Sequence, residues 1–114
     1  QGEIRDAGGV AGRANLAQAL VLRLLTRKGA LTGLGHPDYG CRLLELIGEL
    51  NNEATRNLAR LFTIQAIQQE ARVKTLLELA VATVADQPDT IRISFSVLPV
   101  DDNDPLALTL EVML

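Results

Sequence analysis

The sequence is poor in aromatic residues and in cysteine, although 47% of its 114 residues are hydrophobic. It contains no tryptophan, and only Tyr39, Phe62 and Phe95 carry aromatic rings. Such rings commonly line small-molecule pockets and stack on single-stranded nucleic acids, so their scarcity disfavours both kinds of site. The single cysteine, Cys41, excludes an internal disulfide and cannot form a cysteine-rich metal site.

Two further absences concern membranes and nucleic acids. The longest apolar stretch is interrupted by Arg23, Thr26, Arg27 and Lys28, whereas a membrane span needs about 18 consecutive apolar residues, so no span is expected. Residues 1–74 carry a net charge of +3 and residues 75–114 a net charge of −6, and neither part has the basic density of a duplex-binding surface. The asymmetry indicates different neighbours at the two ends, with solvated faces as the alternative.

The hydrophobic pattern changes from a helical to a strand period at Val73. Residues 1–14 are glycine-rich and predict an irregular N-terminal arm. Residues 15–70 predict three helices, over about 15–28, 39–47 and 51–69. Leu58 and Leu61 are expected in the core, and Thr63 on a face toward solvent or a partner. Residues 73–114 predict three strands with turns at 87–90 and 101–105. The expected fold is α+β, three helices followed by a three-stranded antiparallel β-meander in a single domain, 1–114.

The segment between the first two predicted helices holds the only histidine and the only tyrosine. Gly29 is expected to stop the first helix, and Asp38 to cap the second through the backbone N–H of residue 40 or 41. Cys41 is expected to point into the core as a small hydrophobe. The segment is therefore predicted to be a structural loop, formed by His36, Pro37, Asp38, Tyr39 and Gly40.

The first and last predicted elements both indicate contacts with other chains. The first helix is apolar around much of its circumference, so a second cover, such as another chain, is expected. The last strand is apolar at alternate positions, and Glu111 is its only charge. Unless the helices or the N-terminal arm cover it, such an edge can accept a strand from another chain. The residues predicted to set the register of strand addition are Leu106, Leu108, Leu110 and Val112.

The sequence gives little support for catalysis or metal binding. His36, Asp38 and Cys41 lie within six residues of one another, whereas catalytic triads are assembled from separate segments. These residues also leave no convincing fourth ligand for a metal. We therefore expect no nucleophilic, metal or cofactor site.

Hydrolysis by a pair of carboxylates is also disfavoured. The candidate residues are Glu70, Asp38 and Glu45. Glu70 precedes Arg72 by two residues, and a neighbouring guanidinium keeps a carboxylate ionised, which is unsuitable for a general acid. A structural or docking ion pair fits Glu70 and Arg72 better.

Four segments of the sequence, residues 15–20, 25–29, 35–43 and 70–73, carry a recognisable combination of motifs. Together they resemble the baseplate wedge and sheath-initiator family of contractile tails, named for the phage W baseplate protein and the product of gene twenty-five of phage T-four. The most similar branch is that of phage-tail-like extracellular injection systems. The resemblance covers about residues 10–98. The family motif is Glu-Pro-Arg, and this chain has Ala71 in place of the proline, so its third helix is expected to run about a residue further.

The resemblance implies a structural role without enzymatic activity. It implies that Glu70 and Arg72 contact neighbouring wedge proteins, and that the C-terminal strands accept arms of the sheath protein and start sheath polymerisation. It also implies six copies per baseplate, with tube and spike hub proteins as further candidate partners. Assembly would take place in the bacterial cytoplasm, as part of a phage tail or a tail-like particle that is released from the cell. The alternative is a tail-associated peptidoglycan hydrolase, because the family often carries a lysozyme label.

Overall fold

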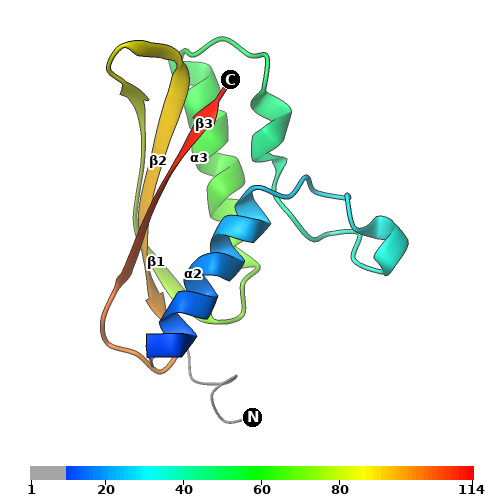
Figure 1. Cartoon of the computed structure of the whole chain (residues 1–114), viewed down its shortest axis with the longest axis vertical. Helices are drawn as coiled ribbons and strands as arrows, with labels where there is room; N and C mark the ends of the chain where they lie inside the picture. Colours follow the sequence, from blue (N-terminus) through cyan, green and yellow to red (C-terminus); the bar gives the residue numbers. More distant parts are fainter. Residues whose placement is uncertain (1–9) are drawn as a thin grey trace.

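The computed structural model describes residues 10–114, which form two layers in a single domain. The three strands make one antiparallel sheet in the order β1-β2-β3, and the two α-helices lie over one of its faces (Figure 1). The strand part agrees with the prediction, but the prediction of three helices is wrong. The elements are α2 (Val10–Leu24), the 3-10 helices η1 (Thr32–Leu34) and η2 (Arg42–Leu46), α3 (Glu53–Gln68), β1 (Val73–Val84), β2 (Gln87–Pro99) and β3 (Leu106–Met113).

The second predicted α-helix is the short 3-10 helix η2. A 3-10 helix has three residues per turn, so side chains three residues apart lie on the same face. Leu43 and Leu46 accordingly share the buried face, with 0% and 4% exposure, whereas Ile47 is 51% exposed. The apolar residues are therefore used at a spacing of three, and the segment does not extend into an α-helix.

The boundaries of α2 differ from those predicted at both ends. The helix begins at residue 10 rather than 15, so the last part of the predicted arm is helical, while residues 1–9 lie outside the described residues. It ends at residue 24 rather than 28. The hydroxyl of Thr26 donates to the carbonyl of Leu22 (2.6 Å), and the carbonyl of Thr26 accepts from the backbone N–H of Cys41 (2.8 Å). These bonds turn the chain away from the helix axis before Gly29 is reached.

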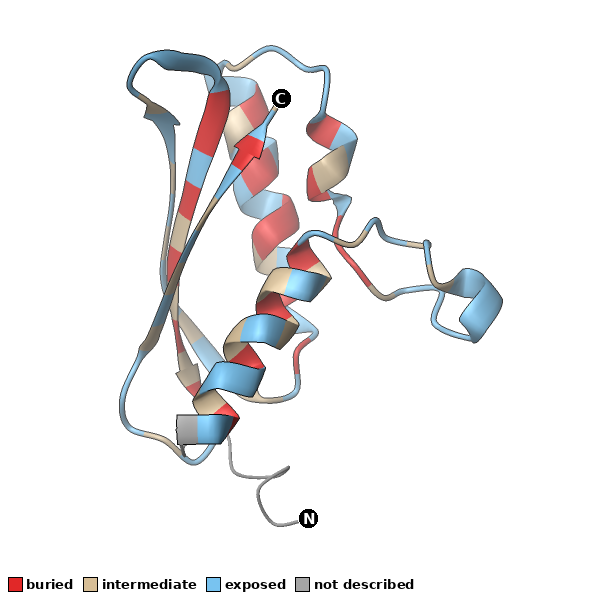
Figure 2. Ribbon diagram, viewed as in Figure 1, coloured by how far each residue is buried: buried red, intermediate tan, exposed pale blue. Residues whose placement is uncertain are grey.

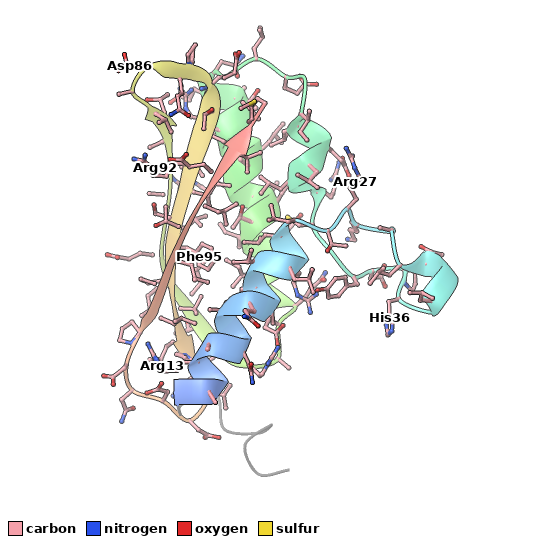
Figure 3. The ribbon with its side chains drawn as sticks, viewed as in Figure 1. Arg13, Arg27, His36, Asp86, Arg92 and Phe95 are labelled. Atoms are coloured by element: carbon pink, nitrogen blue, oxygen red, sulfur yellow. The ribbon has the colours of Figure 1, made fainter. Side chains whose placement is uncertain are left out.

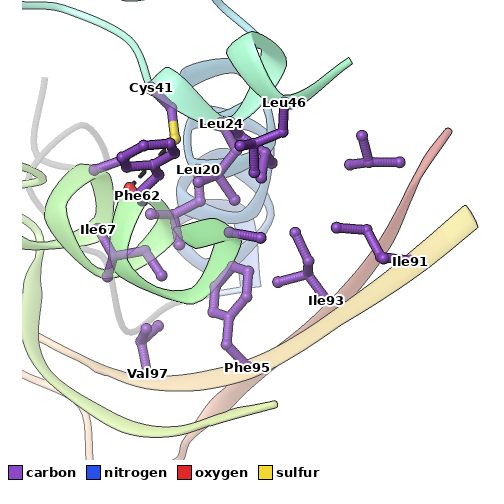
Figure 4. Close-up of a cluster of buried hydrophobic side chains, with 14 of the residues drawn as sticks. Leu20, Leu24, Cys41, Leu46, Phe62, Ile67, Ile91, Ile93, Phe95 and Val97 are labelled. Carbon is purple, nitrogen blue, oxygen red and sulfur yellow. Dashed lines mark hydrogen bonds between the residues drawn. The ribbon is translucent and has the colours of Figure 1, made fainter. Parts of the chain in front are cut away.

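The core lies between the helices and the inner face of β2 (Figures 2 and 4). Cys41 is 2% exposed, as predicted, and its Sγ donates to the carbonyl of Phe62 (3.3 Å). On α3, Thr63 is fully buried because its hydroxyl donates to the carbonyl of Ala59 (2.7 Å), while Leu58 and Leu61, both predicted to be core residues, are exposed. The remaining buried residues of the core include Leu16, Leu20, Leu24, Ala66, Ile67, Ile91, Ile93, Phe95 and Val97.

The hairpin between β1 and β2 is tighter than predicted. Its two-residue turn is Ala85–Asp86, and Asp86 adopts a φ of 64°, a conformation that aspartate tolerates better than most residues. Residues 87–90, predicted to form the turn, belong to β2 instead. The register between β1 and β2 shifts there, between Thr83 and Val84 of β1. The turn predicted at 101–105 is present. No helix within residues 10–114 is long and apolar enough to cross a membrane.

Candidate functional site

An arm between α2 and η2 projects away from the helices and the sheet (Figure 1). It is ordered by its own backbone hydrogen bonds, in which the N–H groups of Leu34 and His36 both donate to the carbonyl of Leu31 (3.0 Å each). None of the residues of η1 is buried, and the arm appears almost wholly exposed in Figure 2. His36 and Pro37 lie on this arm and are exposed. The arm is therefore a preformed projection that its own domain does not cover.

The base of the arm is closed by Gly40. This residue is buried with a φ of +111°, and a Cβ atom there would lie 2.6 Å from the carbonyl oxygen of Thr26. The tight approach allows residues 27 and 41 to form an isolated bridge. The predicted cap by Asp38 is wrong: η2 has Cys41 at its N-cap and no side-chain capping bond. Gly40 therefore fixes the direction in which the arm leaves the domain.

Glu70 lies between two arginines where the end of α2 meets the turn after α3. Its Oε2 accepts from Nε of Arg72 (3.0 Å), and its Oε1 lies 3.5 Å from an Nη2 of Arg23. Arg23 in turn stacks on the ring of Tyr39, 4.6 Å from its centroid. Glu70 is 8% exposed, whereas the side chain of Arg72 is 38% exposed. The predicted pair therefore exists, and Arg72 is its exposed member.

The electrostatics of this cluster keep Glu70 ionised. Burial alone raises the pKa of a carboxyl, but the hydrogen bond and charge of Arg72, together with the charge of Arg23, outweigh it and lower the pKa of Glu70. A general acid for glycoside hydrolysis needs the opposite shift. The lowered pKa of Glu70 therefore argues against this residue as such an acid. Among residues 10–114 no three His, Cys, Asp or Glu side chains are grouped so as to hold a metal ion.

The turn that carries this pair forms without proline. α3 ends at Gln68 and does not extend toward Ala71. The N–H of Val73 donates to the carbonyl of Glu70 (3.1 Å), which closes a turn around Ala71 and Arg72. The carbonyl of Arg72 accepts from the N–H of Val100 (2.9 Å), so the turn is also tied to the end of β2. These backbone hydrogen bonds fix the turn that carries Glu70 and Arg72, as a proline ring at position 71 would otherwise do.

The two edges of the sheet differ. β1 carries Lys74 and Glu78, its register with β2 is irregular at three places, and the guanidinium of Arg60 donates to the main-chain carbonyl of Leu79 (2.8 Å). β3 pairs with β2 without a register shift, and its only charge, Glu111, is held by Arg92 (2.8 Å). Bulges and charges are the usual means of preventing strand addition. β1 therefore has the features of a protected edge and β3 does not.

The apolar side chains of β3 face the core. They stand opposite the inward residues of β2, so they share the inner face of the sheet with them. Val112 is buried, and the other three are partly buried against the core. Strand addition at this edge would therefore use the main-chain groups of β3. The inward side chains would hold β3 itself in position by packing on the core. The residues are Leu106, Leu108, Leu110 and Val112, opposite Val97, Phe95, Ile93 and Ile91.

Some contacts of these sites could not be predicted from the sequence. Arg13 donates to the carboxylate of Asp102 (2.6 Å) and to the carbonyls of Asp104 and Pro105 (2.8 Å each), so it ties the start of α2 to the turn before β3 (Figure 3). Arg60 at the β1 edge is a second example. Both are single arginines on helices, and no local pattern distinguishes them from solvated charges.

Comparisons with known proteins support the fold. No protein-family model and no curated protein matches the sequence. A solved structure, the "putative tail lysozyme" of Geobacter sulfurreducens, resembles this chain with a TM-score of 0.76 over 90% of each chain and with 20% sequence identity. At that identity the likeness establishes the shared fold, and the activity in that name is a statement about that protein.

Proposed function

We propose that the chain is a structural, non-enzymatic subunit of a contractile tail or of a tail-like injection system. In this proposal it docks on the baseplate wedge and accepts strands of the sheath protein at β3, in six copies per baseplate, as part of a particle assembled in the bacterial cytoplasm. The motif resemblance over residues 10–98 supports this role, and the shared fold with a protein named for a tail is consistent with it.

The observation that carries the proposal is the difference between the two sheet edges. Strand addition binds a partner through main-chain hydrogen bonds, so it needs a regular edge without obstructing charges. β3 has unbroken register with β2 over Thr90–Val97, and its inward side chains already pack on the core. A strand added there would extend a supported sheet.

The docking half of the proposal rests on the cluster at Glu70. A partly exposed arginine held by a buried carboxylate is preorganised, so little side-chain freedom is lost when a partner carboxylate binds it. Arg72 is held in this way by Glu70. The proposal assigns the partner contact to Arg72 and the orienting role to Glu70.

The edge can be tested with charges on the outer face of β3. Ala107 and Thr109 are exposed and face away from the helices, so the double variant A107K/T109K should fold normally. Lysine on an edge strand discourages addition of a further strand. We expect baseplates with this variant to carry no extended sheath in electron micrographs. Deleting β3 would be a poorer test, because Val112 belongs to the core.

The matched control places the same charges on the outer face of β1. Ala80 and Ala82 are exposed and stand opposite Ser94 and Arg92 of β2. The variant A80K/A82K should leave sheath length unchanged. Full-length sheaths on A107K/T109K baseplates, with the variant subunit shown to be present, would refute strand addition at β3.

A further inference from the structure

The free edge of β3 presents a row of main-chain groups whose identity follows from one hydrogen bond. Met113 stands opposite Thr90, and one residue further on the N–H of Leu114 donates to the carbonyl of Asp89 (2.7 Å). Along an antiparallel pair, hydrogen-bonded and non-hydrogen-bonded positions alternate. Because the register has no shift, the even-numbered residues of β3 bond to β2 and the odd-numbered ones point their N–H and C=O groups to the free edge. The edge-facing residues are Ala107, Thr109, Glu111 and Met113.

The inner side chains of β3 are covered incompletely. Leu106, Leu108 and Leu110 face the core but remain partly exposed, whereas Val112 is buried. Within residues 10–114 no further strand pairs with β3, since the sheet ends there. A strand added at this edge would cover the three leucines if its own inner positions were apolar, because side chains directly opposite each other on one face interact. β3 itself has apolar residues at these alternate positions.

β3 is complementary to a second, antiparallel copy of itself when the two-fold axis passes through Leu110. Thr109 then lies opposite Glu111 of the second copy and can exchange both main-chain hydrogen bonds with it. Ala107 lies opposite Met113 of the second copy in the same way. Every main-chain group that faces the free edge therefore finds a partner in this register.

The inner face of this register is apolar throughout. The positions between the hydrogen-bonded pairs are those at which side chains come closest across an antiparallel pair. Here they bring Leu110 opposite Leu110 of the second copy, and Leu108 opposite Val112. Leu106 meets Leu114 at both ends. The partly exposed leucines of each copy are therefore covered by the other copy.

The neighbouring registers are less favourable. An axis through Thr109 places Met113 opposite Pro105, which has no N–H to donate. An axis through Glu111 places two glutamates directly opposite each other, and like charges at opposite positions are destabilising. The axis through Leu110 avoids both defects.

We propose that the free subunit forms a two-fold dimer in which β3 pairs with β3 of a second copy, antiparallel and centred on Leu110. The partner at this edge is thus a second copy of the chain until the subunit enters an assembly. That the pair covers the edge needed by the sheath strand rests on the proposed function. The pairing itself does not, because it follows from β3 alone.

The first test uses the full-length protein without any substitution. Sedimentation equilibrium should show a reversible dimer that dissociates on dilution. Leu108 and Val112 lie about 13 Å apart along one strand. Across the proposed pair their Cα atoms would be about 4.5 Å apart. A mixture of isotope-labelled and unlabelled protein should therefore give intermolecular NOEs between the Hα protons of these two residues.

Charges at position 109 test the register, because this residue lies opposite Glu111 of the second copy. T109E should raise the dissociation constant of the dimer by about threefold to tenfold, since it creates two symmetry-related pairs of like charge. T109K should lower it, since each lysine then meets a glutamate. Ala80 stands opposite Ser94 from the other side, in the same row and on the same face as Thr109. The matched controls A80E and A80K should therefore leave the dissociation constant unchanged.

Three results would overturn the inference. The first is a protein that stays monomeric up to millimolar concentration. The second is a dimer that neither T109E nor T109K affects, because another surface would then form it. The third is weakening by both variants, which indicates an axis through Thr109. Each of these leaves strand addition by the sheath protein possible, whereas full-length sheaths on A107K/T109K baseplates would refute the proposed function and leave the wild-type dimer and its NOEs in place.

Discussion

Replacing Gly40 by alanine should destabilise the protein more than any other glycine-to-alanine change in the projecting arm. Its φ of +111° is unfavourable for a residue with a Cβ, which costs about 1–3 kcal/mol. The new Cβ would also lie 2.6 Å from the carbonyl oxygen of Thr26 and 2.9 Å from that of Arg27. Both are backbone atoms, so the segment after α2 that contains them must move.

The movement would weaken the hydrogen bond from the N–H of Cys41 to the carbonyl of Thr26, which is 2.8 Å long. The loss of one such bond adds about 1 kcal/mol. We therefore expect G40A to lower the free energy of unfolding by about 2–4 kcal/mol in urea titrations. For a domain of this size the melting temperature should fall by about 10–20 °C.

Two matched controls separate strain from the steric clash. Gly35 has a φ of +86° but nothing within 4 Å of its Cβ position, so G35A should show the strain alone. Gly33 has neither feature, so G33A should be close to neutral. The reasoning is refuted if G40A is no less stable than G35A. Hydrogen exchange at Cys41 should accelerate in G40A and not in the controls.

Three further predictions concern charged residues. E70Q should lower the free energy of unfolding by about 1–3 kcal/mol near neutral pH, because it leaves Arg23 and Arg72 without a buried counterion. Urea titration would measure the loss, with R42A, which removes an exposed ion pair, as the control. The pKa of Glu70 is lowered in the folded state, so its ion pairs stabilise the protein fully above the ordinary pKa of 4.5, and this stabilisation is lost as the pH falls through the folded pKa. The difference in unfolding free energy between wild type and E70Q should therefore shrink over that pH range. A difference that stays constant would contradict the prediction. R13A should speed hydrogen exchange in residues 101–105 while leaving the β1–β2 hairpin unchanged, since Arg13 holds only the former turn; equal acceleration at both turns would argue against this role. The wild-type protein should not lyse purified peptidoglycan, and lysis that disappears in E70Q would overturn the structural role.

The sequence predicts the sheet better than the helices, for a physical reason. Ile91, Ile93 and Phe95 alternate with polar residues because one face of β2 is buried and the other is not, so the pattern is visible locally. On α3 the prediction that the face with Leu58 and Leu61 is buried was wrong. Thr63 is buried because its hydroxyl is satisfied within the helix, and Leu58 is left exposed. A hydropathy pattern does not show that a hydroxyl is hydrogen-bonded within its own helix and can therefore be buried.

The candidate site was predictable only in part. Glu70 and Arg72 are neighbours in the sequence, so their pairing was visible. Arg23 lies 47 residues from Glu70, and its contact depends on how α2 packs against the turn after α3. The difference between the sheet edges also needed the structure, because the irregular register of β1 and the contact of Arg60 with Leu79 arise from tertiary packing.

The protected edge at β1 has a consequence for the free protein before any assembly. A chain with two receptive edges can join its own copies end to end without limit, as amyloid-forming segments do. A chain with one receptive edge can only form a closed two-fold pair, in which β3 of one copy meets β3 of another and no edge remains. Arg60 and the irregular register of β1 therefore disfavour end-to-end fibres of the free protein.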